Sequence, residues 1–254
     1  MRPAIPQRRL VALGQTRLAP GETVLVALKP SAAARYASQG LVVKEYQSRS
    51  VVVPRLPAAP TPRLQLPLEN SAGIGIVVGG AEDVLAEYEK AKDLCAATGR
   101  KFVTLVTNDM IEHFTDCCDH AVTLHARVKL PLWLKARAKK GLSAPARVWA
   151  QKAEPHVDGV CREWGQGSVG LFAVKIALLE LRLAQVLLCG VPMTEEAGHF
   201  RRHRPWKDYY VFRKLWLARK DEIATCVRSF SGWTAELFGQ PTMDFIKAEV
   251  SLCP

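Results

Sequence analysis

The chain has 254 residues, of which 48% are hydrophobic and 23% are charged. This composition is ordinary for a soluble globular protein, and the length allows one sizeable core with a small accessory piece. No apolar run approaches the roughly 20 residues that span a bilayer, and the opening residues MRPAIPQRRL lack the apolar region of a secretory signal. We therefore expect a cytoplasmic protein with no membrane partner.

The seven cysteines are scattered, odd in number, and include no CxxC pair. This pattern indicates neither a disulfide framework nor a zinc site, so we expect reduced, mostly buried thiols and no structural metal. The net charge of +11 is uneven, because residues 1 to 70 contain ten Lys and Arg but only three Glu. The basic excess favours contact with nucleic acid or another acidic surface, and solubilising charge is the alternative interpretation.

Residues 1–53 contain two short β-like runs, Thr23 to Leu28 and Leu41 to Tyr46, separated by an Ala-rich stretch that suits a turn of helix. We expect a small basic β-rich module here. Prolines at 54, 57, 60, 62 and 67 each remove a backbone donor and disfavour helix in the preceding residue. Residues 54–70 are therefore predicted to be an extended linker, and residues 71–254 a separate domain.

After the linker, apolar runs alternate with amphipathic helical stretches. The predicted elements, in chain order, are a strand at 73–78, a helix at 81–97, a strand at 101–106, a short helix near Met110, a strand at 120–125, a helix at 130–140, a strand at 147–150, a helix at 168–183 and a strand at 185–191. Parallel strands need a crossover of a dozen or more residues, which these helices supply. The pattern predicts an α/β, Rossmann-like fold: a mostly parallel sheet with helices on both faces.

In such sheets, ligands bind beyond the carboxyl ends of the strands. After the first strand, Gly79 and Gly80 permit a sharp turn that exposes the amides of the next helix to a phosphate. The alternative is that the acidic residues Glu82 and Asp83 complement the helix dipole. After the second strand, Asn108 has the donors and the acceptor to bind a base or ribose, and Asp109 suits a hydroxyl or a metal ion. A plain helix N-cap is an equal interpretation there.

The stretch Trp164 to Ala173 is the most specific local signal in the chain. Its glycines, including Gly167 and Gly170, permit close approach of a ligand, and Ser168 suits an N-cap or a phosphate oxygen. The alternative is a tight turn that only packs helix against strand.

Three further loops complete the predicted site. Pro192 follows the most hydrophobic strand, and His199 lies in the polar loop beyond it, where it suits a general base or a structural role. The basic cluster at 201–207 suits a phosphate clamp or a solvated lid. Arg228 and Ser231, which follow a further expected strand and precede a helix that ends near Gly239, offer a guanidinium and a hydroxyl to phosphate, with a cap and turn as the alternative.

The segments GSVGLFAVKIALLELRLAQVLLCGVPM, His199-Phe200 and the later S-G-x-T pattern resemble a known group of sequences. From about Gly73 to Thr242, the chain is similar to uncharacterised Rossmann-like proteins of tailed phages and prophages. It is more distantly similar to bacterial sialyltransferase-like and hydroxymethylpterin-diphosphokinase-like proteins. The resemblance implies that Gly79 and Gly80 lie near phosphate, that Asn108, Ser168 and Gly170 line the same cleft, and that His199 approaches an acceptor.

Two functions follow as expectations. The first is a phage-type transferase that binds a nucleotide or nucleotide-sugar donor, with His199 removing a proton from an acceptor hydroxyl. It requires His199 and Asn108 on the same side of the sheet. The second is a non-catalytic phage protein, virion-associated or located in the host cytoplasm, whose basic N-terminal module engages DNA or a phage structural protein.

Overall fold

The computed structural model describes residues 24–25, 42–46, 49–53, 73–162, 167–200 and 209–248. Internal contacts divide the chain into two units, residues 1–64 and 65–254. The predicted linker, the Ala-rich stretch and the basic cluster at 201–207 lie outside the described residues.

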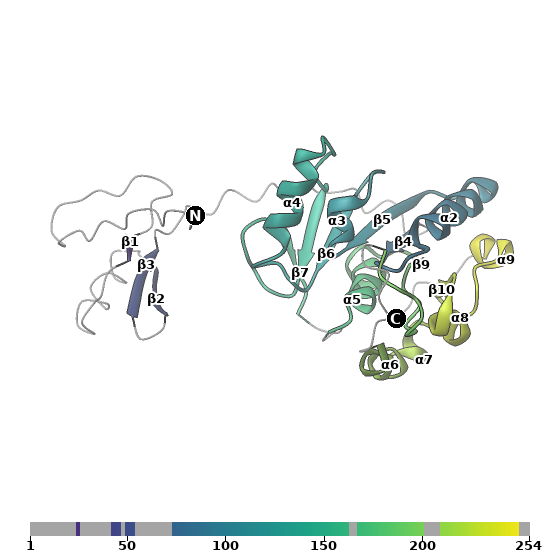
Figure 1. Ribbon diagram of the computed structural model, residues 1–254. Coiled ribbons are helices and arrows are strands. Elements are labelled where there is room, and N and C mark those ends of the chain that lie inside the picture. The colour runs from purple at the N-terminus through teal and green to yellow at the C-terminus, as the bar shows by residue number, and fades with distance from the viewer. Residues whose placement is uncertain are drawn as a thin grey trace. The chain divides into compact units, whose positions relative to one another are not determined.

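The first unit contains a three-stranded antiparallel sheet in the order β1-β3-β2 (Figure 1). Strands β1 (Val24–Leu25) and β2 (Val42–Tyr46) lie within the two predicted runs. Strand β3 (Arg49–Val53) was not predicted, although its three valines favour extended backbone.

The second unit contains a seven-stranded sheet in which every neighbouring pair is parallel, in the order β10-β9-β4-β5-β6-β7-β8. The predicted α/β, mostly parallel fold is therefore confirmed. The strands are β4 (Ile74–Val78), β5 (Phe102–Thr107), β6 (His120–Thr123), β7 (Arg147–Ala150), β8 (Gly159–Val160), β9 (Gln185–Cys189) and β10 (Val227–Ser229). Of these, only the two-residue edge strand β8 has no counterpart in the sequence prediction.

The helices of this unit are α2 (Val84–Thr98), α3 (Met110–His113), α4 (Leu130–Lys139), α5 (Val169–Lys175), α6 (Tyr209–Leu217), α7 (Lys220–Ile223), α8 (Gly232–Phe238) and α9 (Met243–Lys247). The long helix predicted at 168–183 is α-helical only in its first half and continues as a π-helix, Ile176–Glu180. The Leu181 amide donates to the Ile176 carbonyl at 2.9 Å, the wider i to i+5 spacing.

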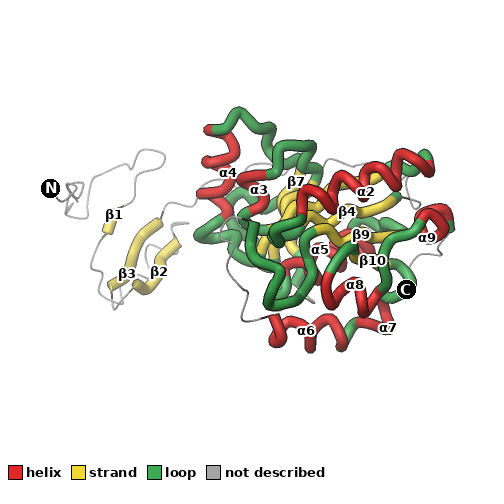
Figure 2. Tube along the Cα trace, turned by 45° about the vertical axis from the view of Figure 1, so that its right-hand side comes forward, coloured by secondary structure: helices red, strands yellow, loops and turns green. Residues whose placement is uncertain are grey.

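Two apolar cores lie on opposite faces of the sheet, because successive strand residues point to opposite sides. Ile76 and Val78 of β4 face the core made with α2, α3, α4 and α9, whereas Val77 faces the core made with α5, α6, α7 and α8. Figure 2 shows α3 and α4 on the side of the sheet away from α6 and α7. Helices therefore cover both faces, as predicted.

The strand order reverses at β4. From β4 the chain runs through β5 to β8 in one direction, then returns to place β9 and β10 on the other side of β4. The carboxyl ends of β4 and β9, followed by Gly79 and Gly190, meet at this switch point, where open α/β sheets bind their ligands.

Five cysteines are free thiols, and all except Cys117 are buried. Cys226 is disulfide-bonded, so the prediction of reduced thiols is wrong at that position, because spacing along the chain does not reveal which cysteines converge. None of the helices in the described ranges has the length and apolar character needed to cross a bilayer.

Candidate functional site

The loops after β4 and β9 pack directly against each other. The Gly79 amide donates to the Cys189 carbonyl at 2.7 Å, and the Ala81 amide donates to the Gly190 carbonyl at 3.1 Å. A Cβ on Gly79 would lie 2.1 Å from the Gly190 oxygen, so only glycine fits. These two amides are therefore used within the fold and are not available to a phosphate.

The loop that carries His199 is paired to the same turn. The Glu82 amide donates to the Gly198 carbonyl and the Phe200 amide to the Gly80 carbonyl, both at 3.1 Å, and Ala81 forms an antiparallel bridge with His199. A Cβ on Gly80 would lie 3.3 Å from His199 Nε2. The short ladder therefore fixes the imidazole over the carboxyl edge of the sheet.

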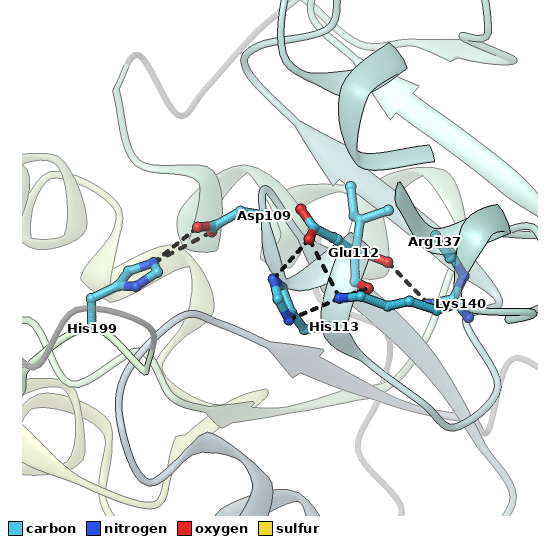
Figure 3. Close-up of polar contacts among 7 residues, drawn as sticks. Asp109, Glu112, His113, Arg137, Lys140 and His199 are labelled. Atoms are coloured by element: carbon cyan, nitrogen blue, oxygen red, sulfur yellow. Dashed lines mark hydrogen bonds and ion pairs between the residues drawn. The ribbon is translucent and has the colours of Figure 1, made fainter. Parts of the chain in front are cut away.

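Asp109 and His199 point toward each other across this edge (Figure 3). His199 Nε2 lies 3.2 Å from Asp109 Oδ2 and 3.4 Å from Oδ1. Their side chains are 32% and 23% exposed, so the pair is sheltered yet open to solvent. Asp109 directly follows Asn108 at the end of β5, which places Asn108 and His199 on the same side of the sheet, as the transferase hypothesis requires.

Asn108 is held in a left-handed conformation, with φ of 47°, which Asn tolerates better than most side chains. Its amide N–H donates to the Val122 carbonyl at 3.0 Å, and its Oδ1 accepts from Thr123 Oγ1 at 3.1 Å. In the part of the chain that the structure describes, Asn108 Nδ2 has no hydrogen-bond partner. Two amide donors are therefore available to a ligand beside Asp109.

His125, at the end of β6, belongs to the same group of side chains. Burial lowers its pKa, the charge of Lys129 lowers it further, and the carboxylate of Asp109 opposes both effects. Asp109 and Lys129 thus both lie within electrostatic reach of His125. The edge formed by β5 and β6 carries a carboxylate, imidazoles and a cation.

A second polar group supports His199 from α3. Phe200 stacks on the His199 ring, with centroids 4.8 Å apart, and meets the His113 ring edge-on at 5.2 Å. His113 is in turn held by Lys140 Nζ, 3.2 Å from its Nδ1, and by Glu112 Oε1, 3.3 Å from its Nε2 (Figure 3). Aromatic packing and charged groups from α3 and α4 therefore limit the positions of Phe200 and His199.

On the other side of β4, a cavity of about 250 Å³ lies at the carboxyl ends of β4, β9 and β10. Its wall includes three carboxylates, Glu82, Asp83 and Glu196, together with the predicted residues Pro192 and Ser231. A phosphate placed here would meet three negative charges.

Buried Glu87 adjoins this cavity and was not predicted. Its Oε2 accepts from the Gly190 amide at 2.6 Å, and the Ser231 hydroxyl also hydrogen-bonds to it. Burial raises its pKa, and these two hydrogen bonds partly offset the rise. A signal was present in the sequence, because Glu87 lies on the same helical stripe as the buried residues Val84 and Ala91.

The G-V-P-M and S-G-x-T motifs contact each other. Thr234 Oγ1 donates to the Val191 carbonyl at 2.6 Å, and a Cβ on Gly232 would lie 2.4 Å from Pro192 Cβ. Packing between the two motifs thus explains much of their composition. Pro192 and Ser231 still line the cavity.

The glycine-rich turn before α5 serves the fold. Ser168 is 3% exposed, and its Oγ accepts from the Leu171 amide at 3.4 Å and from Trp216 Nε1 at 3.1 Å. A Cβ on Gly170 would lie 2.8 Å from Val191 Cγ1. Gly167 has φ of +97° and faces the Phe212 ring. The hydroxyl and the close approach predicted for a ligand are here used by helix packing.

Arg228 has a similar role. Its Nη1 donates to the Ala224 and Val227 carbonyls at 2.8 and 2.7 Å, and its guanidinium lies 4.3 Å from the Phe245 ring centroid. Burial lowers its pKa. The structure thus places the predicted residues in three groups. Asn108, Asp109 and His199 lie together beside Gly80; Pro192 and Ser231 line the acidic cavity; Gly79, Gly167, Ser168, Gly170 and Arg228 are engaged in packing.

Within the described ranges, no three His, Cys, Asp or Glu side chains are grouped to hold a metal ion. Comparison of the chain with protein family models, curated proteins and solved structures gives no match.

Proposed function

We propose that the α/β domain binds a nucleotide or nucleotide-sugar at the carboxyl ends of β5 and β6 and transfers a group from it. The observation that carries this proposal is the 3.2 Å contact between His199 Nε2 and Asp109 Oδ2. A partly exposed imidazole oriented by a carboxylate is the arrangement that general-base catalysis uses.

His199 is the proposed base, and Asp109 orients it. When Nε2–H donates to Asp109, the lone pair of the neutral ring lies on Nδ1. Nδ1 then takes the proton of an acceptor hydroxyl as the oxygen attacks the donor, and the carboxylate stabilises the imidazolium that forms. The leaving group is the nucleotide portion of the donor.

Asn108 is the proposed nucleotide contact, because its Nδ2 offers two donors to a base or ribose oxygen. Arg127 and Lys129 are exposed in the loop between β6 and α4 and would neutralise phosphate charge. The carboxylates of the cavity beyond Gly80 would repel phosphate. The donor is therefore expected on the β5 and β6 side.

The test is thermal stabilisation against a panel of nucleotides and nucleotide-sugars. A ligand at about 100 times its dissociation constant adds roughly 2.7 kcal/mol of stability, which raises the melting temperature measurably. Asn108→Ala should abolish the shift. His199→Gln should retain the shift but lower the transfer rate by about a hundredfold or more, while His156→Asn, in the exposed loop between β7 and β8, should change neither. A panel without any shift would exclude the proposal.

A second candidate is a non-catalytic phage protein that uses the scaffold for binding or assembly. The use of Ser168 and Gly170 in packing favours it, because these two residues of the resemblance then maintain the shape of the fold and need no ligand. In that case deletion of residues 1–70 should abolish binding to DNA or a phage structural protein, and nucleotides should have no effect on stability.

A further inference from the structure

The α/β domain contains a long segment of one charge sign. Between residues 120 and 153 the sequence has eight Lys and Arg and no Asp or Glu. This segment includes β6, α4 and β7, all within the described residues. The remainder of residues 71 to 254 has more Asp and Glu than Lys and Arg. The positive charge of the domain is therefore concentrated around α4.

Most of these cations face solvent. Arg127, Lys129, Lys135 and Lys139 are exposed, whereas Arg137 is buried and Lys140 contacts Glu112. The last two serve the packing of α3 against α4. The four exposed cations are therefore accessible to an external partner.

Two large apolar side chains lie among the exposed cations. Val128 is 70% exposed and Leu132 is 63% exposed, the largest values for bulky hydrophobic residues in the described ranges. Val128 lies in the turn that precedes α4, and positions 132, 135 and 139 follow the i, i+3, i+7 spacing of one helix face. The outer face of α4 thus combines cations with accessible apolar surface.

We propose that this α4 surface, formed by Arg127, Val128, Lys129, Leu132, Lys135 and Lys139, binds single-stranded nucleic acid. The cations pair with successive phosphates, which gives affinity without sequence reading. The exposed side chains of Val128 and Leu132 offer nonpolar surface to the faces of unpaired bases. In a duplex the base faces are stacked on one another, so they cannot pack on these two side chains. Two aliphatic side chains without an exposed aromatic residue favour this partner over a lipid surface.

The position of α4 determines where the bound nucleic-acid strand lies relative to the carboxyl edge of the sheet. The helix begins at the carboxyl edge, where the Lys129 amide donates to the His125 carbonyl at 3.1 Å. Strand phosphates bound there lie beside Asn108, Asp109 and His199. At the other end of the edge, Glu82, Asp83 and Glu196 repel a polyanion. The inference does not depend on transferase activity, and it names a macromolecular ligand that the free-nucleotide proposal does not include.

The first experiment measures fluorescence anisotropy of a labelled oligo(dT) strand with the full chain, across a range of salt concentrations. Lys135→Gln/Lys139→Gln should weaken binding by roughly tenfold and reduce the slope of log affinity against log salt by about 1.4, since each phosphate contact contributes about 0.7. The control Lys90→Gln/Lys101→Gln removes two exposed lysines elsewhere and should change neither. Equal effects of the two double variants would overturn the proposal.

The second experiment separates the partners. Val128→Ser/Leu132→Ser should weaken single-strand binding but leave any duplex binding unchanged, and Leu85→Ser, which alters an exposed leucine on α2, should have no effect. Sedimentation with vesicles of anionic lipid tests the alternative. Vesicle binding that both α4 double variants abolish, without binding of the strand to the unaltered protein, would overturn the proposal in favour of a membrane surface.

The basic N-terminal module also attracts polyanions, so the contact must be located on the chain. Photo-crosslinking of an iodouracil-containing strand, followed by mass spectrometry of the peptides, should label residues 127–140. Labelling confined to residues 1–70 would contradict the assignment, whatever the affinity. Because free nucleotides are tested by thermal shift and Asn108→Ala, failure of this inference is distinguishable from failure of the proposed function.

Discussion

The two ends of the carboxyl edge differ in charge although the same sheet builds both. Around α4, the exposed charged side chains are cationic, and no Asp or Glu occurs between residues 120 and 153. Around the start of α2, the cavity is lined by Glu82, Asp83 and Glu196. In Figure 1, α3 lies between these two helices on the same face of the sheet. The fold provides an edge for ligands, and the loop and helix charges decide which part of it accepts an anion.

Each end also contains one buried ionisable side chain. Arg137 belongs to α4 and is 1% exposed. Its side chain donates hydrogen bonds to the carbonyls of Ile111, Phe114 and Ser143. Glu87, 5% exposed in α2, accepts from the Gly190 amide and from Ser231. The cation thus organises the loops around α3, and the carboxyl group organises the turn after β9. In both cases the buried group satisfies backbone polar groups that would otherwise be unpaired.

The largest expected effect is the loss of Arg137. Arg137→Ala leaves three carbonyls without their donor and opens a cavity, so the free energy of unfolding should fall by about 3 to 5 kcal/mol. Urea denaturation measures it. Lys135 is exposed and lies two residues before Arg137 in the same helix. Lys135→Ala should therefore change the free energy of unfolding by less than about 0.5 kcal/mol. If both variants behave alike, Arg137 does not organise this end of the edge.

The next largest loss of stability is expected from a substitution at one of two adjacent glycines. Gly79→Ala forces a Cβ to within 2.1 Å of the Gly190 oxygen, so backbone must move, at a cost of about 1 to 3 kcal/mol. Gly80→Ala meets only the His199 ring at 3.3 Å and should cost much less. It should instead displace the imidazole, visible as a changed His199 chemical shift in NMR spectra. Equal destabilisation by the two substitutions would contradict the assignment of Gly79 to packing and of Gly80 to the site.

Glu87 gives a pH-dependent prediction for the α2 end. Its pKa is raised in the folded protein from the ordinary value of 4.5, so the folded state holds a proton that the unfolded chain releases. Its contribution to stability is complete below about pH 4.5 and is lost as the pH rises through the folded pKa. Glu87→Gln keeps an acceptor and a donor but does not titrate. Its stability relative to the unaltered protein should therefore increase with pH.

Glu87→Ala separates the hydrogen bonds from the charge. It removes the acceptor of the buried Gly190 amide and should cost about 1 to 3 kcal/mol even at low pH. Denaturation of the three proteins at pH 4 and pH 7 distinguishes the two effects. A Glu87→Gln variant with the same pH dependence as the unaltered protein would show that folding does not raise the pKa of Glu87.

The fold was predictable because apolar runs of five or six residues, such as Ile74 to Val78 and Gln185 to Cys189, alternate with helix-length segments. The π-helical turn at Ile176–Glu180 was not, since the residues there are ordinary helix formers. Strand β8 was missed because two residues give no period. The order of the strands in the sheet could not be predicted from the sequence either, because it depends on contacts between distant segments.

The site was predictable only in part, for a related reason. Residues that follow strands were identified by the rule that ligands bind at carboxyl ends, and Asn108, Asp109 and His199 do lie together. The rule did not distinguish glycines and hydroxyls that face a ligand from those that face a helix, as at Ser168 and Gly170. A short polar side chain serves a cap or a phosphate with the same atoms, so burial by a distant residue such as Trp216 decides its role.

The smallest expected effect tests the charge difference between the two ends directly. Asp83 makes no side-chain cap hydrogen bond to α2 and, like Glu196, is exposed, so Asp83→Asn/Glu196→Gln should leave stability nearly unchanged. Removing two negative charges from the edge should raise affinity for a nucleotide found in the thermal-shift panel by only a few-fold, since exposed charges are screened. Lys129→Gln, at the α4 end, should lower it by a comparable factor. Both changes should vanish at high salt, and titration calorimetry at two ionic strengths measures them. If the nucleotide binds more weakly to the Asp83→Asn/Glu196→Gln protein, the ligand lies in the acidic cavity and the assignment of the two ends must be reversed.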